Sequence, residues 1–481
     1  MVALSPSNAQ APAPPRNLHL ASYSGSPAFY VAPNGNDSNP GTLAQPFATL
    51  GRAQQAMRAS STIKTVYIRA GKYTPVPVPK ASCMNGSLSG SSVRLTSADT
   101  GESWSYYPAD GYNSAIIDGQ STVGQSTSTY GAGGNGTGCA FSGYKLSNIT
   151  IVGLQFQNYL YSAFWVNTGS QLTFANNVVH DLTAAAWGAG AVSTTCAPGT
   201  VVKNNYMYNI AYTGTEMESR SDCPGGISND LVSGNIIQNS CTWPAVPGFG
   251  NDQNGGDCGA IYFDDHIRPA STNVLVQNNY IRDVNVSSGG AGDNGANGKQ
   301  GCCALAVYLD DGTSNATVKG NVIGGSKSAC VMIHSGNNDA ISDNICDLGN
   351  SAYQAIVVYQ LETKSANVMS GNSFENNIVI AHSASAGSGF AGYGAPPNPM
   401  TIKNNVYYNY LGSSINSSGT GGAGSDSNPL YENPQLSGWT YNIAAGSPVF
   451  NLPVLFSEII GGWGLPSPSM PQTGSPPSCP Y

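Results

Sequence analysis

Leu172-Thr-Phe-Ala-Asn-Asn177 and Val201-Val-Lys-Asn-Asn205 are two copies of a short segment that recurs through this chain. Each copy ends in an Asn that a hydrophobic residue follows, and successive copies lie 23 to 44 residues apart. The final Asn residues are Asn177, Asn205, Asn235, Asn279, Asn321, Asn344, Asn377 and Asn405. Such a spacing is typical of a solenoid, in which the shortest interval gives the length of one coil and longer intervals indicate loop insertions.

Apolar and polar residues alternate within each coil, and β-branched and aromatic residues dominate, which indicates short strands instead of helices. A strand that keeps its place in every coil must pair in parallel with its equivalents in the coils above and below. The sequence therefore predicts an all-β fold, a parallel β-helix. We expect the repeated Asn side chains to hydrogen-bond from coil to coil as an internal ladder.

The composition narrows the range of partners. The chain has 481 residues with 59 Gly, 30 Pro, 9% charged residues and a formal net charge of -8. So few Lys and Arg argue against nucleic acid or an anionic membrane surface as a partner. No apolar run approaches the length of a transmembrane helix, so we expect no membrane insertion. The oligomeric state stays open.

The eleven Cys residues show no Cys-x-x-Cys spacing of the kind that zinc or thiol redox sites use. Disulfides are the simpler interpretation, with Cys241–Cys258 and Cys196–Cys223 as plausible pairs and one thiol left over. Residues 1–28 resemble the remnant of a leader and a linker. Together these features predict a secreted or periplasmic protein.

Residues 29–464 are expected to form a single β-helix domain, because a repeat fold elongates one continuous core. A short helix within residues 46–59 would cap its N-terminal end. Loop insertions are expected near residues 239–258 and 284–303. Residues 465–481 form a tail that is rich in Pro and Ser.

The two ends of this domain carry a family resemblance. The segment FYVAPNGNDSNPGTLAQPFATLGRAQQAM (29–57) resembles the N-terminal signature of secreted right-handed parallel β-helix proteins that act on polysaccharides. NPLYENP (428–434) and YNIAAGSPVFN (441–451) are similar to their closing segment. The resemblance implies a right-handed parallel β-helix with a carbohydrate as its substrate. It leaves open glycoside hydrolases and polysaccharide lyases, which share this scaffold.

A column of polar residues emerges when the coils are aligned. Matching TEMES (215–219), AIYFDD (260–265), AVYLDD (306–311) and CVMIHS (330–335) places four residues at one position: Glu218, Asp264, Asp310 and His334. Asn167, Ser193 and Tyr359 are expected to extend this column. Because apolar residues alternate with the acids, the acids should point outward, beside Tyr262 and Tyr308. The two long insertions would then wall a groove around them.

Clustered carboxylates suit glycoside hydrolysis, with Asp264, Asp310 and Glu218 as the candidate catalytic residues. Stacked acids repel, so at least one should have a raised pKa and hold a proton, while another stays ionised. Adjacent coils lie ~4.8 Å apart. Carboxyl groups about 5 Å apart suit a retaining enzyme, as for Asp264 with Asp310, whereas about 6.5–9.5 Å suits an inverting one, as for Glu218 with Asp310.

Further residues near this face are candidates for binding the substrate. They are Tyr262, Tyr308, His334, Asp265, Asp311, Glu216, Tyr359, Trp165 and Arg268. The aromatic residues would stack on sugar rings, although strands are also rich in aromatic residues for structural reasons.

Two other functions remain open. A hydrolase of this kind needs no cofactor or metal. In a calcium-dependent lyase acting on a uronate polymer, Asp264, Asp265, Asp310 and Asp311 would instead bind Ca²⁺, and Arg268 or Arg220 would abstract the proton. In a non-catalytic solenoid that binds a glycan, the aromatic rows would matter and the acids would not.

Overall fold

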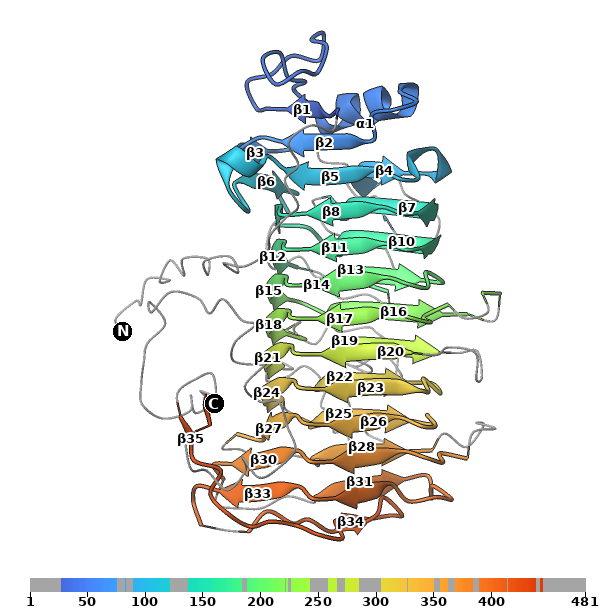
Figure 1. The fold of residues 1–481 in the computed structure, drawn as a ribbon, viewed down its shortest axis with the longest axis vertical. Coiled ribbons are helices and arrows are strands. Elements are labelled where there is room, and N and C mark those ends of the chain that lie inside the picture. Colours follow the sequence, from blue (N-terminus) through green and yellow to red (C-terminus); the bar gives the residue numbers. More distant parts are fainter. Residues whose placement is uncertain are drawn as a thin grey trace.

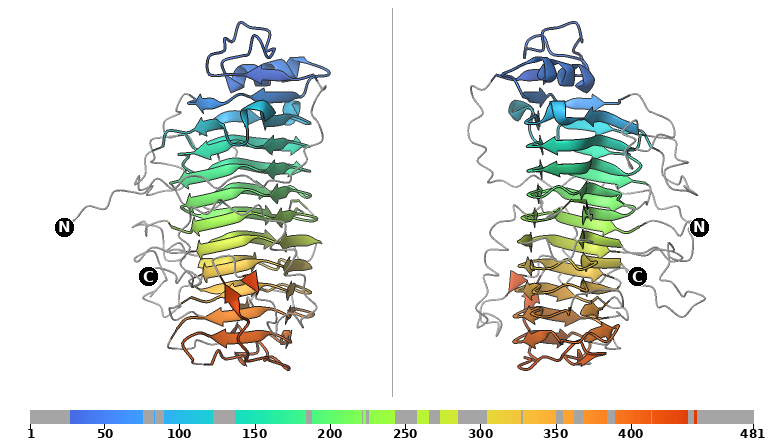
Figure 2. Two further views of the ribbon diagram at one scale, coloured as in Figure 1. Left: turned by 60° about the vertical axis from the view of Figure 1, so that its left-hand side comes forward. Right: turned by 90° about the vertical axis from the view of Figure 1, so that its right-hand side faces the viewer.

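The computed structural model describes residues 27–443, with gaps at 76–82, 84–89, 122–136, 184–187, 221, 224–225, 243–257, 266–272, 285–303, 327, 350–354, 362–367, 384–388, 413 and 438–441. These residues form a stack of coils in which each full coil contributes one strand to each of three parallel sheets (Figure 1). Figure 2 shows the same stack from two further sides. The predicted fold class, an all-β parallel β-helix with a short N-terminal capping helix, is confirmed.

Sheet 1 contains, in order, β1 (Phe29–Val31), β2 (Thr65–Ile68), β5 (Ser103–Tyr106), β8 (Thr150–Val152), β11 (Thr173–Ala175), β14 (Val201–Lys203), β17 (Leu231–Ser233), β20 (Val274–Gln277), β23 (Ala316–Lys319), β26 (Ala340–Ser342), β29 (Ser373–Glu375) and β32 (Thr401–Lys403). Sheet 2 contains β3 (Gly71–Tyr73), β6 (Ala115–Asp118), β9 (Gln155–Gln157), β12 (Val178–Leu182), β15 (Tyr206–Ile210), β18 (Ile236–Ser240), β21 (Tyr280–Val284), β24 (Val322–Ser326), β27 (Ile345–Asp347), β30 (Ile378–Ala381) and β33 (Val406–Asn409).

Sheet 3, which carries the predicted acid column, contains β4 (Ser91–Leu95), β7 (Cys139–Ser147), β10 (Ser162–Ser170), β13 (Gly190–Thr195), β16 (Thr213–Ser219), β19 (Cys258–Asp265), β22 (Ala304–Asp310), β25 (Ala329–His334), β28 (Val357–Gln360), β31 (Phe390–Tyr393) and β34 (Gly419–Thr420). Two 3₁₀ turns, η2 (Ser97–Asp99) and η3 (Pro108–Asp110), lie near the N-terminal end. β35 (Leu436–Ser437) and β36 (Asn442–Ile443) form a small antiparallel pair.

The Asn ladder is confirmed in the turn between sheets 1 and 2. Within the ladder, the Oδ1 of each Asn accepts the backbone N–H of the Asn one coil earlier, as in Asn205 to Asn235 (3.0 Å) and Asn235 to Asn279 (3.0 Å). The Nδ2 donates to the Oδ1 of the next Asn and to a backbone carbonyl, for example from Asn279 to Val232 at 2.9 Å. At the two ends, Asn177 accepts from Leu154 and Asn405 donates to Asp426. Every polar group of these buried side chains is thereby satisfied, which explains why each coil repeats this residue.

A second, shorter polar column lies inside the solenoid where the strands of sheet 1 begin. Asp339 accepts the backbone N–H of Ala316 at Oδ1 (2.9 Å), and its own N–H donates to Asn372 Oδ1 (2.9 Å). Asn372 Nδ2 also donates to the carbonyl of Gly336 (2.8 Å). Asp339 is fully buried, and this burial raises its pKa well above the ordinary value, although the hydrogen bond from Ala316 opposes the shift. Asp339 therefore occupies the place of an Asn in a ladder.

The N-terminal end is capped by helix α1 (Leu50–Ala59), which begins after Thr49, whose side chain accepts the N–H of Arg52. The expected apolar face is buried and continues the interior core: Leu50, Ala53, Ala56 and Met57. The predicted helix is therefore confirmed, although it starts four residues later than position 46. In the described part of the chain, no helix has the length and apolar character needed to cross a membrane.

Both predicted disulfides are present, Cys196–Cys223 and Cys241–Cys258. Two more link Cys83 with Cys139 and Cys330 with Cys346. Four disulfides in one chain are typical of proteins in oxidising compartments. The expected leader remnant, nearly all of both insertions and the C-terminal tail lie outside the described residues.

Candidate active site

The register of sheet 3 brings the predicted acids together. Glu218 in β16 pairs with Asp264 in β19, and Asp264 pairs with Asp310 in β22. His334, at the end of β25, follows as the next residue, because its neighbour Ile333 pairs with Leu309, the residue before Asp310. The sequence alignment of these four residues is therefore confirmed, and they occupy consecutive coils.

These side chains lie on the outer face of sheet 3. The residues that precede the acids in their strands, Met217, Phe263 and Leu309, are completely buried in the interior core. Because successive side chains of a strand point to opposite faces of the sheet, Glu218, Asp264 and Asp310 point outward. The acids are nevertheless covered, since Asp264 is 7% exposed and Asp310 is 4% exposed. The insertions that were expected to wall this region lie almost entirely outside the described residues, and Arg268 does too.

Asp310 is held by three donors. Tyr262 Oη donates to its Oδ2 at 2.7 Å, and its Oδ1 lies 2.5 Å from His334 Nδ1 and accepts the backbone N–H of Asp311 at 2.8 Å. These contacts fix the orientation of the Asp310 carboxyl group next to Asp264.

Glu216 joins the cluster from the same strand as Glu218, two residues earlier and on the same face. Its Oε1 accepts the N–H of Gly188 at 2.9 Å, and its Oε2 contacts Thr213 Oγ1 at 3.3 Å. Burial raises the pKa of Glu216 well above its ordinary value, and the charges of Glu218 and Asp264 raise it further. Burial and the neighbouring acids thus favour the protonated form of Glu216, which the sequence analysis names only as a candidate for binding the substrate.

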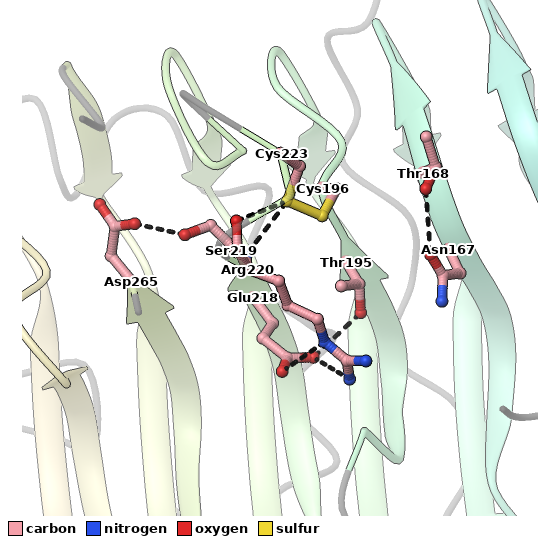
Figure 3. Close-up of a disulfide and its surroundings, with 9 residues drawn as sticks. All are labelled: Asn167, Thr168, Thr195, Cys196, Glu218, Ser219, Arg220, Cys223 and Asp265. Atoms are coloured by element: carbon pink, nitrogen blue, oxygen red, sulfur yellow. Dashed lines mark hydrogen bonds and ion pairs between the residues drawn. A yellow bond between two sulfur atoms is a disulfide. The ribbon is translucent and has the colours of Figure 1, made fainter. Parts of the chain in front are cut away.

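Glu218 faces a different environment. Thr195 Oγ1 donates to its Oε2 at 3.0 Å, and Arg220 donates from Nε to Oε1 (3.0 Å) and from Nη2 to Oε2 (3.1 Å). Figure 3 shows Thr195, Glu218 and Arg220 converging at the end of β16, beside the Cys196–Cys223 disulfide. Glu218 is therefore paired with a cation, whereas burial and the neighbouring acids raise the pKa of Glu216 two residues away.

A second outward column runs parallel to the acids. Glu216 pairs with Tyr262, Tyr262 with Tyr308, and Tyr308 with Met332. The two tyrosine rings meet edge to face at 5.0 Å and belong to a small apolar cluster on this outer side. Tyr262 and Tyr308 thus flank the acids as predicted. Trp165 lies two strands before Glu216 in the same column, and it is almost completely buried.

Two of the three residues predicted to extend the column lie elsewhere. Tyr359 pairs with Ile333, not His334, so it points into the core, where its hydroxyl donates to the carbonyl of Met369 at 2.6 Å. The residue that continues the column is Gln360. At the other end, Thr195 pairs with Glu218, and Asn167 follows as predicted, whereas Ser193 pairs with Glu216.

Asp265, predicted to bind substrate or Ca²⁺ beside Asp264, lies away from the column of acids. It follows Asp264 directly, so it points to the opposite side of β19, where it is buried and hydrogen-bonded to Ser219. The four carboxylates expected to bind Ca²⁺ therefore do not share one side of the sheet, and this set does not fit the ion. Ligand atoms of Asp310, Asp311 and His334 do lie within 4.8 Å of one another. Two carboxylates and an imidazole supply fewer oxygens than the six to eight that Ca²⁺ takes.

Comparisons with known proteins extend the description of the fold. No protein-family model and no curated protein matches this sequence. Among solved structures, the GH136 lacto-N-biosidase from Eubacterium ramulus matches with a TM-score of 0.54 and 14% identity over 84% of this chain and 67% of that chain. The catalytic domain of a GH87 alpha-1,3-glucanase in complex with nigerose matches with a TM-score of 0.46 and 15% identity, over 82% of this chain and 66% of that one. At such identities the likeness shows the fold.

Proposed function

We propose that this chain is a glycoside hydrolase that cleaves a polysaccharide or oligosaccharide at the outer face of sheet 3. The observation that carries the proposal is the juxtaposition of a proton-holding Glu216 with the carboxylates of Asp264 and Asp310 on consecutive strands. Hydrolysis of a glycosidic bond uses this combination, one carboxylic acid and one carboxylate. The GH136 lacto-N-biosidase uses the same kind of scaffold, but because fold alone does not fix function, the acids support the proposal.

The roles follow from the surroundings of each group. Glu216 is the general acid, because it keeps a proton that it can give to the leaving oxygen. Asp264, one strand further along, is the carboxylate that activates water or attacks the sugar. Asp310, fixed by Tyr262 and His334, places a negative charge near the positive charge that develops on the sugar ring.

Strand geometry gives the stereochemical outcome of this pairing. Glu216 lies one strand (~4.8 Å) across and two residues (~6.6 Å) along from the position of Asp264, a diagonal of about 8 Å. Carboxyl groups that keep this backbone spacing would fall within the roughly 6.5–9.5 Å typical of inverting enzymes. A pairing of Asp264 with Asp310 across adjacent strands would instead give retention. The anomeric form of the first product, read by proton NMR, therefore distinguishes the two pairings.

The activity is tested on a panel of neutral and uronate polysaccharides and oligosaccharides. We expect new reducing ends, no ultraviolet absorbance from unsaturated uronates, and no loss of rate with EDTA. Absorbance that EDTA abolishes would instead establish the calcium-dependent lyase, for which Asp310, Asp311 and His334 are the nearest candidate ligands. Binding of a glycan without any product would establish the non-catalytic alternative.

A further inference from the structure

Donors from two consecutive coils hold Glu218, and a disulfide joins the coils at that point (Figure 3). Thr195, at the end of β13, donates one hydrogen bond to the carboxylate, and Arg220, just after β16, donates two. Cys196 follows Thr195 directly, and Cys223 lies three residues after Arg220. The disulfide therefore links the two segments that carry the partners of Glu218.

The backbone around this disulfide is tied at several points. The N–H of Cys223 donates to the carbonyl of Arg220 at 2.9 Å, and the N–H of Arg220 reaches the Sγ of Cys223 at 3.0 Å. The N–H of Cys196 donates to the carbonyl of Glu218 at 2.7 Å. Arg220 and Cys223 are thus tied to each other and, through Cys196, to the preceding coil.

Without such an anchor, this ion pair would be weak. The Arg220 side chain is 50% exposed, and ion pairs between exposed side chains are weak because water and side-chain entropy oppose them. Bidentate geometry on a fixed backbone reduces that entropy cost. Glu218 is the register partner of Asp264 on the neighbouring strand. Its orientation therefore affects the binding of a molecule that lies over the column of acids.

We infer that Arg220, anchored by the Cys196–Cys223 disulfide, is a positioning residue that holds Glu218 in the orientation that receives a hydroxyl group of the sugar beside Asp264. The inference rests on the proposed function. Neutralised by Arg220, Glu218 accepts a hydroxyl hydrogen bond without adding a further uncompensated charge to Asp264 and Asp310. Reduction of the Cys196–Cys223 disulfide would free Arg220 from this anchor and thereby weaken substrate binding.

The test compares kcat and KM of the parent with those of Arg220→Gln, Arg220→Lys and the double variant Cys196→Ser/Cys223→Ser. We expect Arg220→Gln and the double variant to lower kcat/KM about 10- to 100-fold, since small misplacements of a positioning group have effects of this size. The loss should fall mainly on KM, because Glu218 contacts the sugar and not the bond that breaks. Arg220→Lys should lower kcat/KM less than Arg220→Gln does, because Lys keeps the positive charge but cannot donate two parallel hydrogen bonds to Glu218.

Matched controls separate positioning from stability. Arg69 also binds a carboxylate through two nitrogens, at 2.6 and 3.1 Å from Asp110, near the N-terminal end of the solenoid. Arg69→Gln and Cys83→Ser/Cys139→Ser should change the melting temperature but not kcat/KM. If the double variant at positions 196 and 223 fails to fold, Arg220→Gln decides alone.

The assays distinguish the hydrolase activity from the positioning role of Arg220. Unchanged kcat/KM in Arg220→Gln, in a parent that hydrolyses a glycan, would overturn the positioning role and leave the hydrolase intact. A parent that hydrolyses no glycan of the panel would overturn the proposed function and the positioning role together.

Discussion

Replacing Asp339 with Asn is expected to stabilise the protein at neutral pH and to change its stability little in acid. Burial raises the pKa of this carboxyl group in the folded state, whereas the unfolded chain ionises it above about pH 4. The free energy of unfolding therefore falls as pH rises from the unfolded pKa to the folded one, by about 1.4 kcal/mol per unit. Asn removes this loss, so the stability advantage of the variant should grow as pH rises above about 4.

The amide also fits the site. Asn keeps the oxygen that accepts the N–H of Ala316, and its Nδ2 replaces an oxygen that has no hydrogen-bond partner among the described residues. A Cβ added to Gly336 would lie 2.2 Å from both Asp339 Oδ2 and the carbonyl of Thr313, so that carbonyl is within reach of the new amide. Asn372 makes the equivalent bond one coil later, to the carbonyl of Gly336.

Urea unfolding of the parent and the variant at pH 4, 5 and 6 measures the effect. The reverse change, Asn372→Asp, is the matched control and should destabilise the protein increasingly as pH rises. A stability difference between Asp339→Asn and the parent that does not vary with pH would refute the raised pKa of this buried carboxyl group.

Three further changes test the site and the ladder. Glu216→Gln should lower kcat by about 10²–10⁴ and remove the alkaline fall in activity that loss of its proton causes, as steady-state pH profiles would show. Tyr262→Phe keeps the ring but removes the 2.7 Å hydrogen bond to Asp310, and should lower kcat about tenfold and the free energy of unfolding by about 1–3 kcal/mol. Asn279→Ala removes two donated and two accepted hydrogen bonds, and should lower the free energy of unfolding by about 4 kcal/mol in urea titrations.

The fold was predictable because one side chain repeats for one physical reason. A buried Asn in the turn of each coil can complete its hydrogen bonds only if equivalent Asn residues stack from coil to coil. The spacing of these Asn residues along the sequence therefore gives the length of each coil. The same stacking predicted the register of Glu218, Asp264 and Asp310. Period-two alternation then predicted which side of the sheet they occupy.

The failures have equally local causes. Tyr359 was placed one residue out of register, and in a strand such a slip moves a side chain to the opposite face. Asp265 was grouped with Asp264 although neighbouring residues in a strand point to opposite sides. The protonation of Glu216 depends on burial and on charges from neighbouring coils, which spacing alone does not reveal.

We propose that the outward acids of sheet 3 catalyse hydrolysis, and the rate of Asp264→Asn measures how far the reaction depends on them. The substitution keeps the size of the side chain but removes its charge, so the variant should retain the melting temperature of the parent. On a glycan that the parent hydrolyses, we expect the release of reducing ends to fall by at least about 10³-fold. Full activity of Asp264→Asn would contradict the account.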